Sequence, residues 1–155
     1  MAETIPVSRI MTTEVVTLSP DQPVSEAADA LADNAIGAAP VLDADGRLVG
    51  MLRDDDLIVS ETRLHVPTMI EIFGVGAVWP PSERRWEHEL RKAAAFSVGD
   101  IMTTDFEQVG SHESVESVAT LMHDKKLSHV PVVDDGALVG IVSRGDLVRF
   151  LAATT

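Results

Sequence analysis

The 155-residue sequence contains no cysteine and no tyrosine, and aromatic residues make up only 4% of it. The absence of cysteine excludes disulfide bonds, thiol catalysis and thiolate metal sites, and it weakly favours a cytoplasmic location. No apolar run approaches the roughly 18 residues of a membrane span. The N-terminus lacks a basic segment followed by an apolar one, so we expect no signal peptide. With 45% hydrophobic residues, the chain is instead typical of a globular protein.

Basic residues are scarce. There are 12 lysines and arginines against 25 aspartates and glutamates, a formal net charge of −13. Such a charge repels phosphate backbones and anionic lipids, which argues against nucleic-acid and membrane partners. A small phosphorylated ligand would therefore need a local pocket of hydrogen-bond donors.

The sequence also lacks the signatures of common catalytic sites. There is no glycine-rich phosphate loop of Walker type and no G-x-S-x-G motif. The five histidines, at positions 65, 88, 112, 123 and 129, show no metal-ligand spacing such as H-x-x-x-H. We therefore expect neither an enzyme nor a metal protein, and no required cofactor.

An internal repeat is the strongest feature of the sequence. VSRIMTTEVVTL at 7–18 aligns with VGDIMTTDFEQV at 98–109, an offset of 91. The offset falls to 90 after a one-residue deletion in a turn, where LVG at 48–50 aligns with LVG at 138–140. The chain is therefore a duplication, with repeats at 1–60 and 98–155 and an insert at 61–97.

Each repeat predicts the order β-α-β-β-α. Short strands are expected at 15–18 and 106–109, each followed by a helix with apolar residues at i, i+3, i+4 and i+7. Pro23 and Ser114 suit the helix starts. Two strands joined by an Asp-Gly turn come next, and final helices begin near 54 and 144. The predicted class is α/β (α+β), with the two repeats packed about a pseudo-twofold axis because one unit of this size is marginal alone.

The order IMT, PV-[LV]-D, then G-apolar-apolar-x-x-x-D resembles the CBS (cystathionine-β-synthase-type) domain, in both repeats. Such pairs are known as Bateman modules, and the insert is similar to that of some bacterial stand-alone pairs. The resemblance implies a cytoplasmic regulatory module that binds AMP, ADP or ATP in the clefts between repeats. It also implies a homodimer and a protein partner that reads the ligand-bound state. The alternative is a ligand-free structural or interaction module.

GIVSRGD at 140–146 matches the family's nucleotide motif, which assigns Ser143 and Arg144 to phosphate and Asp146 to the ribose hydroxyls. The same Ser-x-x-Asp pattern is typical of a helix capping box, and one residue can serve both roles. The resemblance further assigns adenine and phosphate contacts to a segment before a strand: Ser128, His129, Val130 and Pro131. For His129, a surface histidine without a ligand role remains open. Thr104, with Thr103, is a weaker candidate, and both also suit hydrogen bonding at a strand entry.

The first repeat departs from this pattern, because Arg53 stands where the second repeat has Ser143, although Asp56 is retained. A weaker second site is therefore expected, formed by Asp56, Arg53, Gly37, Ala39 and Pro40. The run Asp54–Asp56 favours a solvated first helical turn that complements the helix dipole over a Mg²⁺ site.

The insert at 61–97 holds both tryptophans, Trp79 and Trp86. Pro80 and Pro81 suit a helix start, and the apolar residues that follow predict one helical face. This face either covers an edge of the pair or contacts a partner.

Overall fold

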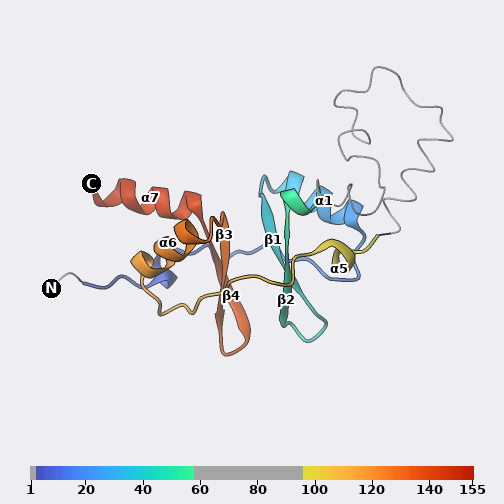
Figure 1. Cartoon of the computed structure of the whole chain (residues 1–155), viewed down its shortest axis with the longest axis horizontal. Helices are drawn as coiled ribbons and strands as arrows, with labels where there is room; N and C mark the ends of the chain where they lie inside the picture. Colours follow the sequence, from blue (N-terminus) through green and yellow to red (C-terminus); the bar gives the residue numbers. More distant parts are fainter. Residues whose placement is uncertain (1–2, 58–95) are drawn as a thin grey trace, which may run out of the picture. The chain divides into compact units, whose positions relative to one another are not determined.

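The computed structural model describes residues 3–57 and 96–155. Both tryptophans and the helix expected after Pro80 lie outside the described residues. The described elements in chain order are η1 (Val7–Arg9), α1 (Val24–Asp33), β1 (Ala38–Leu42), β2 (Leu48–Arg53), α5 (Val98–Ile101), α6 (Val115–Asp124), β3 (His129–Asp134), β4 (Ala137–Ser143) and α7 (Arg144–Thr154) (Figure 1). No described helix is long and apolar enough to cross a membrane.

The fold is a mixed α/β arrangement with two small two-stranded sheets, β1-β2 and β3-β4, as the sequence predicted (Figure 1). Each sheet is a hairpin closed by a turn with glycine in the left-handed region, at Gly46 and Gly136, both with φ of +80°. Asp135 also has a positive φ of +49°, so the Asp-Gly pair supplies the two left-handed residues that a tight hairpin turn needs. In the β3-β4 sheet the pairing runs from His129 opposite Ser143 to Asp134 opposite Ala137.

The expected strands at 15–18 and 106–109 are not formed as strands. Each reduces to one parallel bridge, Leu18 with Val41 and Val109 with Val132. In this register the next bond toward the N-terminus would need the N–H of the residue before Val41, which is Pro40. Proline has no such donor, and Pro131 occupies the equivalent place in the second repeat. The prolines therefore limit each ladder to its bridge.

The two long helices after these segments begin where the sequence predicted. Pro23 is the N-cap of α1, and Ser114 is the N-cap of α6. The Ser114 hydroxyl accepts a hydrogen bond from the backbone N–H of Ser117 at 3.0 Å. Both helices end before a residue with positive φ, at Ala35 and Lys126, which occupy equivalent positions in the two repeats. The duplication therefore extends to the helix ends.

The compact units of the structure divide the chain differently from the sequence repeats. Of the described residues, unit 1 comprises 3–15, 44–48 and 105–155, and unit 2 comprises 16–43, 49–57 and 96–104. The first residues of each repeat thus belong to the unit that contains most of the other repeat. The boundaries 1–60 and 98–155 therefore mark the repeats of the sequence and are not the boundaries of the compact units.

Apolar burial explains this exchange of segments. Val7 is completely buried in the core of unit 1, among residues of the second repeat such as Val118, Val130 and Val142. Val98, its equivalent, is completely buried in the core of unit 2. Full burial of such a side chain contributes about 1.5–3 kcal/mol, so each core is incomplete without the segment from the other repeat.

Candidate functional site

The start of α7 carries the two residues that the nucleotide motif singled out. Ser143 is the N-cap, and its hydroxyl accepts the backbone N–H of Asp146 at 3.2 Å. The Asp146 carboxylate in turn accepts the backbone N–H of Ser143 at 2.9 Å. The capping box expected from the sequence is therefore present. The Ser143 hydroxyl acts as an acceptor in the cap, so its proton remains available for donation to a ligand.

Asp146 is one of the two buried polar or charged residues among those described, with 5% of its surface exposed. Besides the Ser143 N–H, it accepts the Thr12 hydroxyl at 3.4 Å to each carboxylate oxygen. It also forms an ion pair with Arg149, one helical turn further along α7. Since a buried carboxylate is stable only when hydrogen-bonded or paired, these donors account for its burial.

Unit 2 repeats this arrangement around Asp56. Its carboxylate accepts the Arg53 backbone N–H at 2.9 Å and the Thr103 hydroxyl at 3.0 and 3.2 Å. Residues 54–57 are helical, so Asp56 stands in a first helical turn as Asp146 does. Because Arg53 stands where the second repeat has Ser143, the residue before this helix start carries no hydroxyl.

The threonines that reach these carboxylates are fixed by backbone pairs. Thr12 exchanges both backbone hydrogen bonds with Ile141, at 2.8 and 2.9 Å. Thr103 does the same with Met51, at 2.8 and 2.9 Å. The sequence analysis missed Thr12, although the offset of 91 aligns it with Thr103, which was named. Thr104, which was grouped with Asp146, is exposed and belongs to unit 2, whereas Asp146 belongs to unit 1.

The other residues assigned to the second-repeat site lie close to Ser143. Arg144 is exposed, and its backbone N–H donates to the Ser128 carbonyl at 3.1 Å. Its side-chain Nε donates to the Leu127 carbonyl, also at 3.1 Å. The Ser128 hydroxyl contacts His129 Nδ1 at 3.0 Å. The structure therefore gathers Ser128, His129 and Arg144 at the end of the β3-β4 sheet, where α7 starts.

The apolar residues of the two segments assigned to ligand contacts are already engaged in the core or in backbone hydrogen bonds. Val130 is completely buried in the core, and Pro131 accepts the Val109 N–H through its carbonyl at 3.1 Å. In the first repeat Ala39 is likewise completely buried, and the Pro40 carbonyl accepts the Leu18 N–H at 2.9 Å. Gly37 accepts the Asp54 N–H at 2.9 Å, which joins it to the helix start that carries Asp56.

The acidic run 54–56 forms a first helical turn, with Asp54 and Asp55 exposed. Asp54 accepts the N–H of Asp55 at 2.8 Å, a local bond of the kind that stabilises a helix start. Within residues 3–57 and 96–155, no group of three His, Asp or Glu side chains is placed to hold a metal ion.

A comparison with known families identifies the fold. The sequence model of the CBS domain matches residues 7–61 and 98–153. The chain belongs to the CBS-domain family. A chloroplastic CBS domain-containing protein of Arabidopsis thaliana, CBSX1, is 33% identical to it over 143 residues. These cover 85% of this chain but only 57% of that relative, so the chain spans little more than half the length of CBSX1.

Solved CBS-domain structures share the fold. The CBS domain of a CBS domain-containing membrane protein from Sphaerobacter thermophilus is 30% identical, with a TM-score of 0.76 over 94% of this chain and 87% of that one. CBSX2 of Arabidopsis thaliana, solved in complex with AMP, is 27% identical, with a TM-score of 0.72 over 96% of this chain and 97% of that one. None of these three CBS proteins bears an enzyme's name.

Proposed function

We propose that this CBS pair is a regulatory module that binds an adenosine nucleotide, AMP, ADP or ATP, at Ser143 and Asp146. The observation that carries the proposal is the buried Asp146 carboxylate at the start of α7, beside a serine hydroxyl in the same capping box. AMP binding by CBSX2, a protein with the same fold, supports it.

The chemistry of this helix start suits a nucleotide. A carboxylate accepts both hydroxyls of a ribose, which is the role we assign to Asp146. The Ser143 hydroxyl and the first-turn N–H groups of α7 donate to phosphate oxygens. Arg144, the first residue of α7, adds an exposed cation whose Nε donates to the Leu127 carbonyl. These donors offset the unfavourable field of the acidic chain.

The site around Asp56 is proposed to bind more weakly. It retains the carboxylate and its threonine partner, but Arg53 replaces the serine that would donate to phosphate. The Arg53 side chain is bulkier, and it extends from the position where a small hydroxyl is needed. The two repeats would then share a fold and differ in affinity.

Regulation requires that the ligand favour one arrangement of the chain over another. A nucleotide shifts such an equilibrium only by its difference in affinity for the two arrangements. Because Thr12 and Asp146 come from different repeats and meet in unit 1, a ligand on Asp146 acts where the two repeats are joined. We propose that a protein partner reads the resulting change.

Thermal-shift and calorimetric titrations with AMP, ADP, ATP, S-adenosylmethionine and NADH test the proposal. Asp146→Asn should weaken nucleotide binding about 10- to 100-fold, since hydrogen bonds to a charged group contribute about 1.5–3 kcal/mol each. Ser143→Ala should weaken it as well. Ser114→Ala is the matched control, because it removes the N-cap of α6 in the same unit without touching the site. Unchanged affinity in Asp146→Asn would show that the pocket is wrong.

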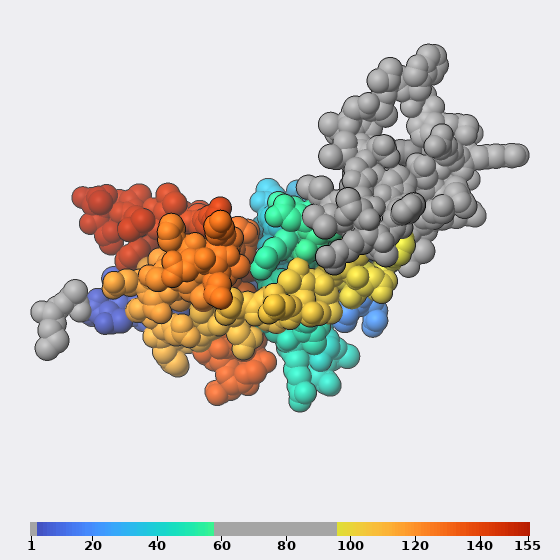
Figure 2. All heavy atoms as spheres, viewed as in Figure 1, coloured from blue at the N-terminus to red at the C-terminus, as the bar shows by residue number. Residues whose placement is uncertain are grey.

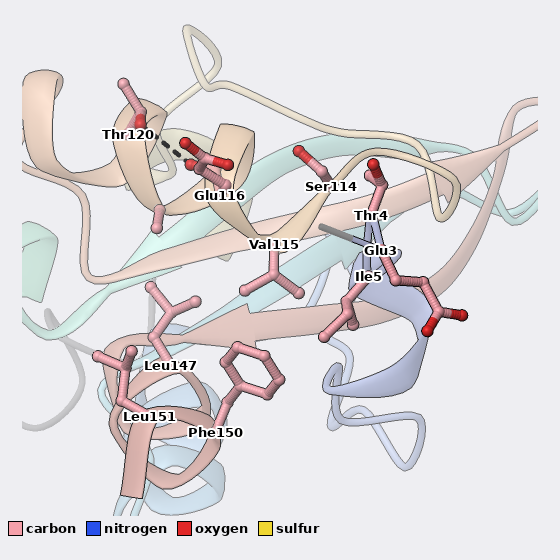
Figure 3. Close-up of a pocket in the computed structure, with 11 residues that line it drawn as sticks. Glu3, Thr4, Ile5, Ser114, Val115, Glu116, Thr120, Leu147, Phe150 and Leu151 are labelled. Atoms are coloured by element: carbon pink, nitrogen blue, oxygen red, sulfur yellow. Dashed lines mark hydrogen bonds between the residues drawn. The ribbon is translucent and has the colours of Figure 1, made fainter. Parts of the chain in front are cut away.

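A second candidate function, an interaction module, is favoured by an apolar surface on unit 1. A pocket of about 480 Å³ lies among residues 3–5, α6 and α7. Figure 3 shows Leu147, Phe150 and Leu151 of α7 facing Val115 of α6 and Ile5. Leu151 and its neighbour Val148 are 61% and 63% exposed. We propose that a second copy of the chain covers this surface in a homodimer.

A further inference from the structure

We propose that Arg149 competes with the ribose for Asp146, so that a nucleotide must displace the arginine before it can bind. This inference rests on the proposed nucleotide site. It identifies Arg149 as a residue that sets the affinity of the second-repeat site and distinguishes it from the first.

The position of the guanidinium supports this role. Arg149 donates to Oδ1 of Asp146, whose side chain is only 4% exposed, while the arginine side chain is 72% exposed. Its Nη1 lies 3.2 Å from the point where a side chain on Gly145 would begin. The guanidinium therefore lies over the first turn of α7 and contacts the carboxylate from the solvent side. A ligand that needs Oδ1 of Asp146 therefore has to compete with Arg149 for it.

Protein donors already take up most of the hydrogen-bonding capacity of Asp146. A carboxylate has about four acceptor positions on its two oxygens. The Ser143 N–H occupies Oδ2, Arg149 occupies Oδ1, and the Thr12 hydroxyl contacts both oxygens. A ribose diol needs one acceptor position on each oxygen, or two on one of them. Of the three donors, Arg149 is the one whose side chain can move into solvent without disturbing the backbone.

The first repeat shows what the same carboxylate looks like without the arginine. The residue that aligns with Arg149, at the offset of 90, is Val59 in the sequence. Among the described residues, the Arg53 backbone N–H and the Thr103 hydroxyl donate to Asp56, and no side-chain cation pairs with it. The first repeat thus has no arginine at the position of Arg149, and the effect of Arg149 can be separated from that of the shared carboxylate and threonine.

Displacement of Arg149 from Asp146 should cost the ligand little binding free energy, because ion pairs with an exposed partner contribute about 0.2–1 kcal/mol. Removal of the arginine charge should therefore tighten ribose binding by up to about fivefold. Adenosine is the right probe, since it carries the ribose but no phosphate that could attract a released arginine. Arg149→Met keeps the length of the stem and a high helix propensity, so α7 is preserved.

The test is calorimetric titration of adenosine into the wild-type protein, Arg149→Met, Asp146→Asn and Lys125→Met. Lys125→Met removes the same charge from an exposed position at the end of α6. We expect tighter binding in Arg149→Met alone, and no change in Lys125→Met. Raising the salt from about 0.05 to about 0.5 M should tighten adenosine binding to the wild type, because the ion pair is screened, and should leave Arg149→Met unaffected.

The outcomes separate the two proposals. Equal or weaker adenosine binding in Arg149→Met, with binding lost in Asp146→Asn, would overturn the competition while leaving the site in place. Adenosine binding that survives in Asp146→Asn would overturn the site itself, and the competition with it.

Discussion

Thr103 donates its hydroxyl to both carboxylate oxygens of Asp56, at 3.0 and 3.2 Å, although the two residues belong to different repeats. Thr12 contacts Asp146 in the same way across 134 positions of sequence, at 3.4 Å to each oxygen. Each of these two carboxylates is therefore contacted by a threonine hydroxyl from the other repeat. The exchange of segments thus brings a threonine to each carboxylate as well as apolar residues to each core.

The two threonines should differ in their effect on stability. The Thr103 bond lies near the normal range for a hydroxyl donor, whereas the Thr12 bonds are long. Thr103→Val should lower the free energy of unfolding by about 1 kcal/mol, the typical loss for one hydrogen bond, and Thr12→Val by less. Urea denaturation of both variants measures the difference. Equal losses would mean that the distances do not reflect the strength of the two contacts.

Gly140 should be required for full stability, because Met11 lies directly over it. A Cβ at Gly140 would come within 2.6 Å of the Met11 sulfur and 3.0 Å of the Thr12 carbonyl oxygen. Gly140→Ala should therefore destabilise the protein by about 1–3 kcal/mol through overpacking. Gly50→Ala should do the same, since its Cβ would lie 2.5 Å from the Met102 sulfur.

Gly110→Ala is the control for this pair, because the nearest atom to its Cβ would lie 3.7 Å away, an ordinary contact. Thermal and urea denaturation measure the stability of all three variants. A wild-type melting temperature in Gly140→Ala would show that the segment carrying Met11 is not held against β4 in solution.

Stability should fall in acid partly because of Asp134. The Ser111 hydroxyl and backbone N–H both donate to its carboxylate and lower its pKa below the ordinary 3.8, and the charge of His112 lowers it further. A carboxyl with a depressed pKa in the folded state stabilises the fold above the unfolded-state pKa. This contribution is lost as the pH falls through the folded-state value.

Ser111→Ala should accordingly lose less stability between about pH 4 and pH 2 than the wild type does. Melting temperatures measured across this range give the slope for each protein. Ser114→Ala removes a different serine hydroxyl and should lower the melting temperature by the same amount at every pH in this range. Parallel curves for Ser111→Ala and the wild type would contradict the assignment to Asp134.

The apolar surface on α7 should determine the oligomeric state. Leu151→Glu places a charge beside Phe150 and Leu147 and should convert the proposed dimer to a monomer of 16.6 kDa. Light scattering on a sizing column measures the mass. Thr155→Glu adds the same charge at the exposed end of the chain and should leave the dimer intact. A dimer that persists in Leu151→Glu would place the interface elsewhere.

Much of the local structure was predictable because its causes are local. The Asp135-Gly136 turn, the Ser114 cap and the Ser143–Asp146 capping box each depend on residues within a few positions of one another. The duplication was also visible in the sequence, and with it the family. The prediction of strands at 15–18 and 106–109 was wrong. Their apolar content suggested strand pairing, but Pro40 and Pro131 lack the backbone N–H that would extend each bridge into a ladder.

The sequence by itself determined the repeats, most of their elements, and the carboxylate and serine at the start of the last helix. Only the tertiary structure decided which repeat completes which core, and so which threonine meets which carboxylate. Val7 is buried among residues more than a hundred positions away, and no periodicity within its own segment indicates that partner. Burial of apolar surface does not depend on the distance between residues in the sequence. The exchange of segments, and the Thr12 hydroxyl that it brings to Asp146, therefore arise only when the chain is folded.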